Sequence, residues 1–373
     1  MKVRFAVLNL RLGGQVSSVL ALARLLADRG IDAQLMLPRG LDAATPVALD
    51  RWARQPFARR MAAVMAMLLR TPERPDVLHL VVPSPSFAGI AAILPQPAHR
   101  ILLQYEGPPL RLDPENLRDL SDAPLFVAPR LILNNMRFAS LGQGLPCHHL
   151  ATHPLIAHRL RDLGFDRVHE VPNVLAPPPR PLWPGTMRPG KHQGMVRVGY
   201  IGHAHRVKGI FDLLCAFDLV AHKRPDLELV LALTSDGAPD RVARLVGAAP
   251  WRDRVTIFGI VDTSQLLGRL DALALPYRSM LTTTLYPSLL VEAAEARCPV
   301  IVSDLPELAP VLRGSPPALY RVPPRCPKAL AKVLEGLGPR DDLGFRPFLE
   351  LPDVSCTVDA LIAIYSDLAA RRP

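Results

Sequence analysis

The stretch from Leu281 to Asp304 constrains this chain most, because it places a polar run, a helix and a buried strand directly after one another. Its sequence is LTTTLYPSLLVEAAEARCPVIVSD. Proline is tolerated in a first helical turn, where its missing N–H would have no intrahelical partner, so Pro287 predicts a helix start. The apolar spacing predicts a helix over Leu289 to Arg297 and a strand over Pro299 to Val302.

The predicted helix start is suited to an anionic ligand. Unpaired backbone N–H groups and a partial positive charge at a helix N-terminus favour a phosphate or diphosphate. Glu292 lies about a turn and a half inside the helix, where its carboxylate can accept two hydroxyls of a sugar ring. Together these features indicate a nucleotide-sugar site, although a helix with one glutamate followed by a strand is also ordinary α/β structure.

Length and composition indicate a globular protein of two domains. The chain has 373 residues, 49% of them hydrophobic and 21% charged, with a mean hydropathy of +0.17. Such a chain can bury two cores of ordinary size. Lys2, Arg4 and Arg11 interrupt the apolar run at the start of the sequence, which is therefore read as a strand and not as a signal peptide. The longest apolar runs are about half as long as a transmembrane helix needs. We therefore expect a cytoplasmic protein, either free in the cytoplasm or bound peripherally to the inner face of the cell membrane.

The net charge predicts anionic partners. There are 44 basic and 34 acidic residues, for a formal charge of +10, which favours nucleotide diphosphates or acidic lipid surfaces. Only 5% of residues are aromatic and none are interleaved with basic runs, so we expect no nucleic acid. Five cysteines without paired ligand spacing predict reduced thiols and no metal site.

The first half begins with a βαβ unit. An apolar strand from Val3 to Leu10 is followed by a glycine turn, a helix from Gln15 to Arg29 and a strand from Ile31 to Leu37. Gly13 and Gly14 let the backbone approach a ligand at the carboxyl edge of the sheet, or they only turn a tight corner. No GxGxxG motif is present, so a dinucleotide is not inferred.

Further strands follow in the first half. They are predicted over Val77 to Val82, Ile101 to Tyr105, Leu131 to Leu133 and Val168 to Val171, with a helix from Pro154 to Leu163. Glu106 directly follows the second of these strands, so we expect it at the sheet edge beside a cleft, or as a solvated turn carboxylate.

The segment from Arg51 to Arg70 is basic and amphipathic. Apolar side chains recur at helical spacing and arginines flank them. The segment predicts either a helix that packs on the sheet with a solvated edge or one that rests on an anionic membrane surface.

The second half repeats this architecture. A strand from Val196 to Ile201 leads into a glycine turn and an amphipathic helix beginning near Ile210. In the turn, the Lys208 ammonium could bind a diphosphate as a point charge, and the planar guanidinium of Arg206 could bind it with two hydrogen bonds. The alternative is a basic loop that is only solvated. Alternating strands and helices continue to Val302 and predict a second doubly wound sheet.

These patterns divide the chain into four parts. We expect an N-terminal Rossmann-like acceptor domain over residues 1–175, a proline-rich linker over 176–195, a C-terminal Rossmann-like donor domain over 196–352, and a terminal helix over 353–373 that crosses back to the first domain.

The order of motifs resembles the GT-B-fold glycosyltransferases, specifically glycosyltransferase family 4. The similar segments are Leu12-Gly13-Gly14, Ala27 to Gly30, Val171-Pro172-Asn173, Gly202-His203 with Lys208-Gly209, Leu275-Pro276, Pro287 to Glu292, and Cys298 to Asp304. The resemblance covers nearly the whole chain and implies two Rossmann-like domains that face each other across a cleft. It is strongest from Val196 to Leu312.

The resemblance implies roles for particular residues. Lys208 would hold the donor diphosphate and Glu292 the ribose hydroxyls. The donor site would also include Gly13, Gly14, Gly202, His203, Thr284 and Leu285, and the catalytic residues would be Lys208, Glu106 and Arg206. Members generally transfer sugar with retention, without a bound metal or another cofactor, so the nucleotide diphosphate sugar is the only small molecule implied besides the acceptor.

Three positions depart from the family pattern. Thr284 stands where the first of two glutamates is expected, His203 where the family has arginine, and Glu106 where a histidine is common. A glutamate at position 106 could orient or deprotonate an acceptor hydroxyl.

The sequence therefore predicts a hexosyltransferase that uses a nucleotide diphosphate sugar and a glycan or lipid-linked acceptor, in cell-surface polysaccharide or glycolipid synthesis. Two alternatives remain open. One is a catalytically silent GT-B-like protein that binds a nucleotide sugar or a partner, and the other is a nucleotide-sugar epimerase.

Overall fold

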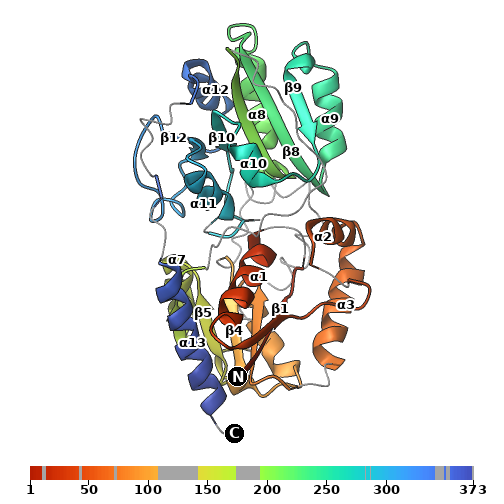
Figure 1. Cartoon of the computed structure of the whole chain (residues 1–373), viewed down its shortest axis with the longest axis vertical. Helices are drawn as coiled ribbons and strands as arrows, with labels where there is room; N and C mark the ends of the chain where they lie inside the picture. Colours follow the sequence, from red (N-terminus) through yellow and green to blue (C-terminus); the bar gives the residue numbers. More distant parts are fainter. Residues whose placement is uncertain are drawn as a thin grey trace.

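A computed structural model describes residues 1–10, 14–41, 44–70, 74–107, 142–173, 194–281, 283–285, 287–340, 348–349 and 353–371. These residues form two α/β domains, one above the other in Figure 1, each built on a six-stranded sheet. The predicted pair of doubly wound sheets is thereby confirmed. The strand predicted over Leu131 to Leu133, Gly13, and most of the predicted linker lie outside the described residues.

The first sheet has the order β2-β1-β3-β4-β5-β6, and all its strand pairs are parallel. Its strands are β1 (Lys2–Val7), β2 (Asp32–Leu35), β3 (Val77–Val82), β4 (Ile101–Tyr105), β5 (His148–Ala151) and β6 (Val168–Glu170). The central strands β3 and β4 are buried along their whole length, which explains their apolar sequences.

The helical elements of the first domain are α1 (Gly14–Ala27), α2 (Pro46–Ala53), α3 (Phe57–Arg70), η1 (Pro85–Ile93), η2 (Ala98–Arg100) and α7 (Pro154–Asp162). The amphipathic segment predicted over Arg51 to Arg70 thus spans the end of α2 and all of α3. No helix in the described ranges is both long and apolar enough to cross a bilayer.

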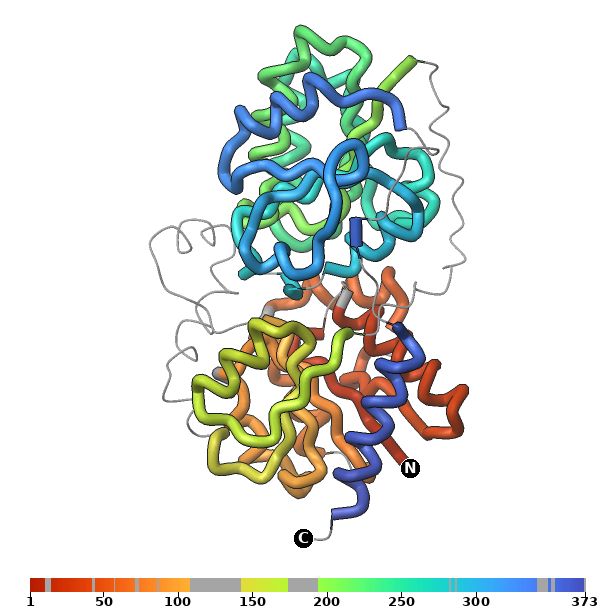
Figure 2. Tube along the Cα trace, turned by 90° about the vertical axis from the view of Figure 1, so that its left-hand side faces the viewer, coloured from red at the N-terminus to blue at the C-terminus, as the bar shows by residue number. Residues whose placement is uncertain are grey.

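The second sheet has the order β12-β11-β10-β7-β8-β9, again with parallel pairs. Its strands are β7 (Val196–Ala204), β8 (Leu227–Gly237), β9 (Val255–Phe258), β10 (Ala272–Leu275), β11 (Val300–Ser303) and β12 (Leu319–Val322). The strand order reverses between β7 and β10, which is where open α/β sheets bind ligands. Figure 2 shows the same two domains from the side.

The helical elements of the second domain are η3 (Arg206–Lys208), α8 (Ile210–Val220), α9 (Pro239–Gly247), η4 (Arg252–Arg254), α10 (Thr263–Leu267), α11 (Ser288–Glu295) and α12 (Pro327–Gly336). The predicted helix over Leu289 to Arg297 is therefore α11, and it ends two residues early. Arg297 has φ +54°, a left-handed conformation that stops the helix before β11.

The last helix, α13 (Val354–Ala370), packs on the first domain although it follows the second domain in sequence. It contacts α1, β3 and η2, and it lies beside the lower domain in Figure 1. Its fully buried Tyr365 shares a hydrogen bond with His79 Nδ1 at 2.7 Å, and His79 Nε2 shares one with Gln104 Oε1 at 2.9 Å. A polar chain inside the core therefore joins α13 to β3 and β4.

We expect His79 to make folding sensitive to acid. Burial lowers the pKa of His79 to about 3, whereas an unfolded histidine titrates near 6.5. Below pH 6.5 the unfolded chain therefore binds the extra proton, and the free energy of unfolding should fall by up to about 1.4 kcal/mol per pH unit for this one group. Denaturant titrations between pH 7 and 4 should give a shallower pH dependence for His79→Gln than for the wild type.

The matched control is His158→Gln, because His158 is exposed on α7. This variant should keep the wild-type pH dependence. Equal slopes for all three proteins would contradict the assignment. Some slope should remain in His79→Gln, because burial also lowers the pKa values of His148 and His149 to about 4.

Candidate active site

The loop after β7 lies at the carboxyl edge of the second sheet, where the strand order reverses. Gly202 has φ +144°, which side chains rarely allow, and the chain then continues through His203 into η3. The hydroxyl of the buried Tyr200 donates to the carbonyl oxygen of His203 at 2.7 Å. The predicted site residues Gly202 and His203, at the end of β7, and Arg206 and Lys208, in η3, therefore lie on one short segment of the chain.

Gly209 joins this loop to the end of β10. It has φ +75°, and a Cβ atom at this position would lie 1.8 Å from the carbonyl oxygen of Pro276. No side chain fits in that space, so the two backbones approach each other directly. The close approach brings the β7 loop against the residues that follow β10.

Lys208 spans from the β7 loop to the threonine run before α11. Its Nζ donates to Thr283 Oγ1 and lies 4.7 Å from the centre of the Tyr277 ring. Tyr277 is itself buried at the end of β10. The ammonium group is thus held in one position by a hydroxyl and an aromatic face.

The predicted helix start follows the threonine run that Lys208 contacts. Pro287 is the N-cap of α11, with extended backbone, and its side chain offers no cap hydrogen bond to the first turn. Leu285 is buried and anchors the loop, while Thr284 is partly exposed. Along the chain, Thr284 and Leu285 lie between Thr283, which contacts Lys208, and the start of α11.

Glu292 lies on α11 and faces α10. The pKa of its carboxyl is raised to about 7, chiefly by burial and also by nearby Glu295 and Asp262, while a hydrogen bond with Thr263 acts in the opposite direction. This carboxyl therefore changes its charge near neutral pH and responds to hydroxyl donors. Thr263 has no sequence signal that links it to Glu292, because only the packing of α10 on α11 brings the two side chains together.

The end of β8 supplies two more polar residues that sequence analysis missed. Thr234 Oγ1 shares a hydrogen bond with His203 Nδ1. Asp236 Oδ2 lies 3.9 Å from His203 Nδ1, and its Oδ1 lies 3.3 Å from His205 Nε2. Their only sequence signal is their position after an apolar strand, at the same sheet edge as the glycine turn.

Two predicted residues lie on the first domain instead. Gly14 begins α1 at the carboxyl edge of β1, and Glu106 follows β4. Glu106 is only 4% exposed, so the alternative of a solvated turn carboxylate is wrong. Its backbone N–H donates to Val82 at the end of β3, which fixes Glu106 at the sheet edge.

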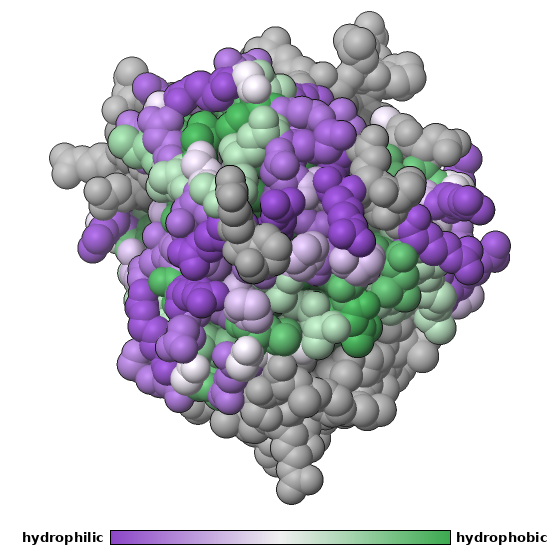
Figure 3. All heavy atoms as spheres, turned by 90° about the horizontal axis from the view of Figure 1, so that it is seen from below, coloured by the Kyte–Doolittle hydropathy of each residue, from purple (hydrophilic) through white to green (hydrophobic). Residues whose placement is uncertain are grey.

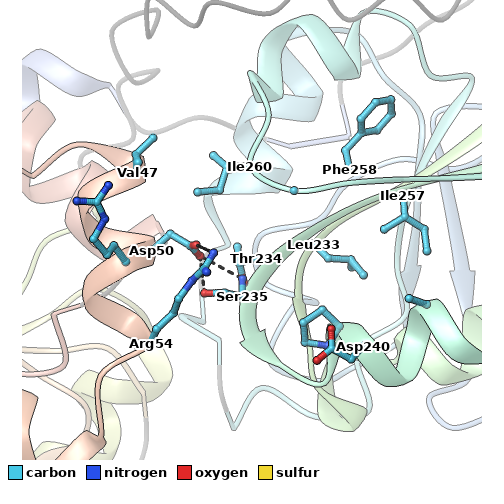
Figure 4. A pocket seen from close by; sticks show the side chains of 14 residues that line it. Val47, Asp50, Arg54, Leu233, Thr234, Ser235, Asp240, Ile257, Phe258 and Ile260 are labelled. Carbon is cyan, nitrogen blue, oxygen red and sulfur yellow. Dashed lines mark hydrogen bonds and ion pairs between the residues drawn. The ribbon is translucent and has the colours of Figure 1, made fainter.

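An open cavity of about 810 Å³ separates α2 from the ends of β8 and β9 (Figure 4). Asp50 of α2 reaches β8 at this cavity. Its Oδ1 accepts hydrogen bonds from the Ser235 N–H at 3.1 Å and from the Ser235 hydroxyl at 2.7 Å. Arg54 pairs with the other oxygen of Asp50 at 3.1 Å. The domains are thus tied together at Ser235, between the two β8 residues that contact His203.

Within the described ranges, no group of three or more His, Cys, Asp or Glu side chains is arranged to hold a metal ion. The positive charges at the loop are those of Arg206 and Lys208. The site can therefore hold an anion with side-chain cations, hydroxyls and a helix N-terminus.

Comparisons with known proteins agree with this geometry. Residues 196–337 match the family model described as "Glycosyl transferases group 1". No curated protein matches the chain. The range that matches the model begins at β7 and ends just after α12, so it contains the loop, Lys208 and Glu292.

Solved structures resemble the chain over its whole length. Anabaena HepE in complex with UDP-glucose is 16% identical, with a TM-score of 0.62, and the match covers 99% of this chain and 98% of that one. MnaA of S. aureus with UDP is 15% identical, with a TM-score of 0.61 over 100% and 99%. WaaG, a glycosyltransferase involved in lipopolysaccharide biosynthesis, is 14% identical, with a TM-score of 0.55 over 98% and 94%.

These findings confirm the predicted resemblance to GT-B glycosyltransferases of group 1 and the predicted fold. The second domain is thus similar to the group 1 glycosyltransferases over residues 196–337, and the solved structures share the fold of the whole chain. The narrower assignment to family 4 stays a prediction, as do the individual site residues.

Replacing Gly209 by alanine should distort the site. The new Cβ would collide with the Pro276 carbonyl, and φ +75° is unfavourable for alanine, so we expect a loss of about 2 kcal/mol or more in the free energy of unfolding. Chemical denaturation measures this loss. Gly247→Ala is the control, because open space surrounds Gly247 at the end of α9, and its stability should change by less than about 0.5 kcal/mol. Equal stability of the two variants would contradict the close approach.

Proposed function

We propose that this chain transfers a hexose from a UDP-sugar to a glycan or lipid-linked acceptor, with retention at the anomeric carbon and without a metal ion. One observation carries the proposal: Lys208 is held against Thr283 beside the start of α11, and Glu292 lies farther along that same helix. The UDP-glucose and UDP complexes of HepE and MnaA support uracil as the base of the donor. Cell-surface polysaccharide or glycolipid synthesis is the process that suits such an activity.

The proposed chemistry follows from where charge develops. When the bond between the sugar and the diphosphate breaks, negative charge grows on the leaving diphosphate. Lys208, Arg206 and the N–H groups of α11 supply fixed positive charge at this place without reorganisation. Stabilising the leaving group is thus the main task of the second domain.

Glu292 is proposed to bind the ribose. Its pKa of about 7 means that a large share of the carboxyl is protonated before the donor arrives. Two ribose hydroxyls that donate to the carboxylate favour its ionised form, so donor binding should lower this pKa. The contact with Thr263 keeps the carboxyl oriented in the meantime.

Glu106 is proposed to face the acceptor. It lies on the first domain at the carboxyl edge of β4, where the residue is only 4% exposed. Such a group can orient an acceptor hydroxyl and take its proton as the new glycosidic bond forms.

A silent nucleotide-sugar-binding protein is the second candidate, and Thr284 favours it. A hydroxyl at this position cannot replace a carboxylate toward the sugar hydroxyls. A protein that binds UDP-glucose but neither hydrolyses nor transfers it with any acceptor would support this candidate, and activity gained in Thr284→Glu would support it further.

Thermal-shift measurements with UDP, GDP, ADP and their sugars test the donor site. A ligand that binds only the folded state raises its melting temperature. UDP and UDP-glucose should stabilise the wild type, and Lys208→Ala and Glu292→Ala should each weaken binding at least about tenfold, because each loses a charge-assisted hydrogen bond.

The controls are Lys223→Ala and Glu335→Ala, the two halves of an exposed ion pair between the turn after α8 and helix α12. Both should bind UDP like the wild type. If no nucleotide shifts the folded wild type, the proposed function is wrong.

We also propose peripheral contact with an anionic membrane through α3. Arg59 and Arg70 are exposed on this helix, and Leu69 remains 47% exposed. Viewed from below, the surface of the molecule shows hydrophobic areas beside hydrophilic ones (Figure 3). Basic side chains beside apolar ones suit the surface of an acidic bilayer.

Co-sedimentation with vesicles tests this contact. Binding to anionic vesicles should weaken as salt rises and should fall in an Arg59→Glu/Arg70→Glu variant. Arg252→Glu, an exposed arginine on the second domain, is the control and should bind as before. Equal binding to neutral vesicles, or none at low salt, would exclude the contact.

A further inference from the structure

The histidine at position 203 raises a question of charge, because the family pattern has an arginine at this place in the donor loop. An arginine is always protonated, whereas a histidine titrates near neutral pH. His203 therefore contributes a positive charge to the loop only when it binds a proton. The groups around its ring decide when this happens.

The ring of His203 is enclosed. Its side chain is 13% exposed, Thr234 shares a hydrogen bond with Nδ1, and the ring of His205 lies edge-on with centroids 5.9 Å apart. The hydroxyl of Tyr200 fixes its backbone. A ring held in this way cannot turn freely to solvent, so its protonation depends on nearby charges.

One carboxylate serves two imidazoles here. Asp236 lies 3.9 Å from His203 and 3.3 Å from His205. A carboxylate at these distances favours an imidazolium, but two imidazolium rings in contact repel each other. We call His203, His205 and Asp236 the histidine cluster.

The other charged groups near the cluster oppose a second proton. Arg206 and Lys208 follow on the same loop, and both are cations. From the β10 side the loop meets the neutral Tyr277 and Arg278. The backbone N–H of Arg278 donates to the Val207 carbonyl, and its guanidinium pairs with Asp212 at 2.7 Å. Without a ligand, the carboxylate of Asp236 is thus shared by His203 and His205, while Arg206 and Lys208 follow on the same loop.

A bound diphosphate reverses this balance. Its negative charge at the loop stabilises the protonated form of any ring beside it. We infer that His203 contacts the donor diphosphate as an imidazolium, and that donor binding draws a proton from solvent onto the histidine cluster. Asp236 and His205 are positioning residues, and Asp236 keeps the new proton on the ring. The inference depends on the proposed function, because it assumes the donor site at this loop.

Calorimetric titration with UDP-glucose tests the inference. Binding is measured at pH 7 in buffers with different ionisation enthalpies, which gives the number of protons exchanged. UDP-glucose is the probe because its diphosphate is esterified at both ends and has no proton to exchange near neutral pH, unlike a terminal phosphate with a pKa near 6.

The decisive quantity is the difference between the wild type and His203→Arg. Glu292 should release a proton on donor binding, but it does so in both proteins, so the difference isolates position 203. On binding UDP-glucose, the wild type should take up roughly half a proton or more relative to His203→Arg. His203→Arg should still bind UDP-glucose, and the contribution of its guanidinium to the affinity should not depend on pH. His203→Gln should lose both the uptake and about tenfold in affinity.

His158→Gln serves as the control and should exchange protons like the wild type, because His158 is exposed on α7 of the first domain. Equal proton counts in the wild type and His203→Arg, with both binding UDP-glucose, would overturn this inference and leave the proposed function intact. If the wild type does not bind UDP-glucose, the inference and the proposed function both fail.

Discussion

The close contact between Gly209 and the carbonyl of Pro276 is the constraint on which the candidate site depends. It holds the end of β7 against the end of β10, at the one place in the second sheet where the strand order reverses. Lys208 precedes this glycine and reaches Thr283 from it. Without this contact, Lys208 would not be held against the threonine run before α11, and a diphosphate would not meet these groups together.

The end of β8 relates this loop to the other domain. Its consecutive residues Thr234, Ser235 and Asp236 contact His203, Asp50 and His205 in turn. Asp50 is a buried carboxylate of the first domain. A change in the position of one domain relative to the other would therefore move the segment from Thr234 to Asp236, and with it the contacts to His203 and His205. The terminal helix α13 adds a second tie, because it follows the second domain yet packs on β3 through Tyr365.

Much of the fold could be predicted from the sequence because it depends on local signals. Apolar strands, glycine turns and helical spacing gave both sheets, and Pro287 marked the start of α11. The polar contacts could not be predicted: Thr263 with Glu292, Thr234 with His203 and Asp50 with Ser235 each join residues from different elements. The end of α11 at Glu295 could not be predicted either, because the left-handed conformation of Arg297 depends on the turn into β11 rather than on the residue type. Spacing along the chain predicts which edge a side chain occupies, but only packing decides its partner.

A crystal structure of the protein with UDP-glucose would show whether the donor binds at the ends of β7 and β10. We predict the diphosphate within hydrogen-bond distance of Lys208 and His203, and the ribose hydroxyls on the carboxylate of Glu292. A nucleotide bound elsewhere, for example in the cavity beside α2 with Lys208 still on Thr283 alone, would contradict this prediction.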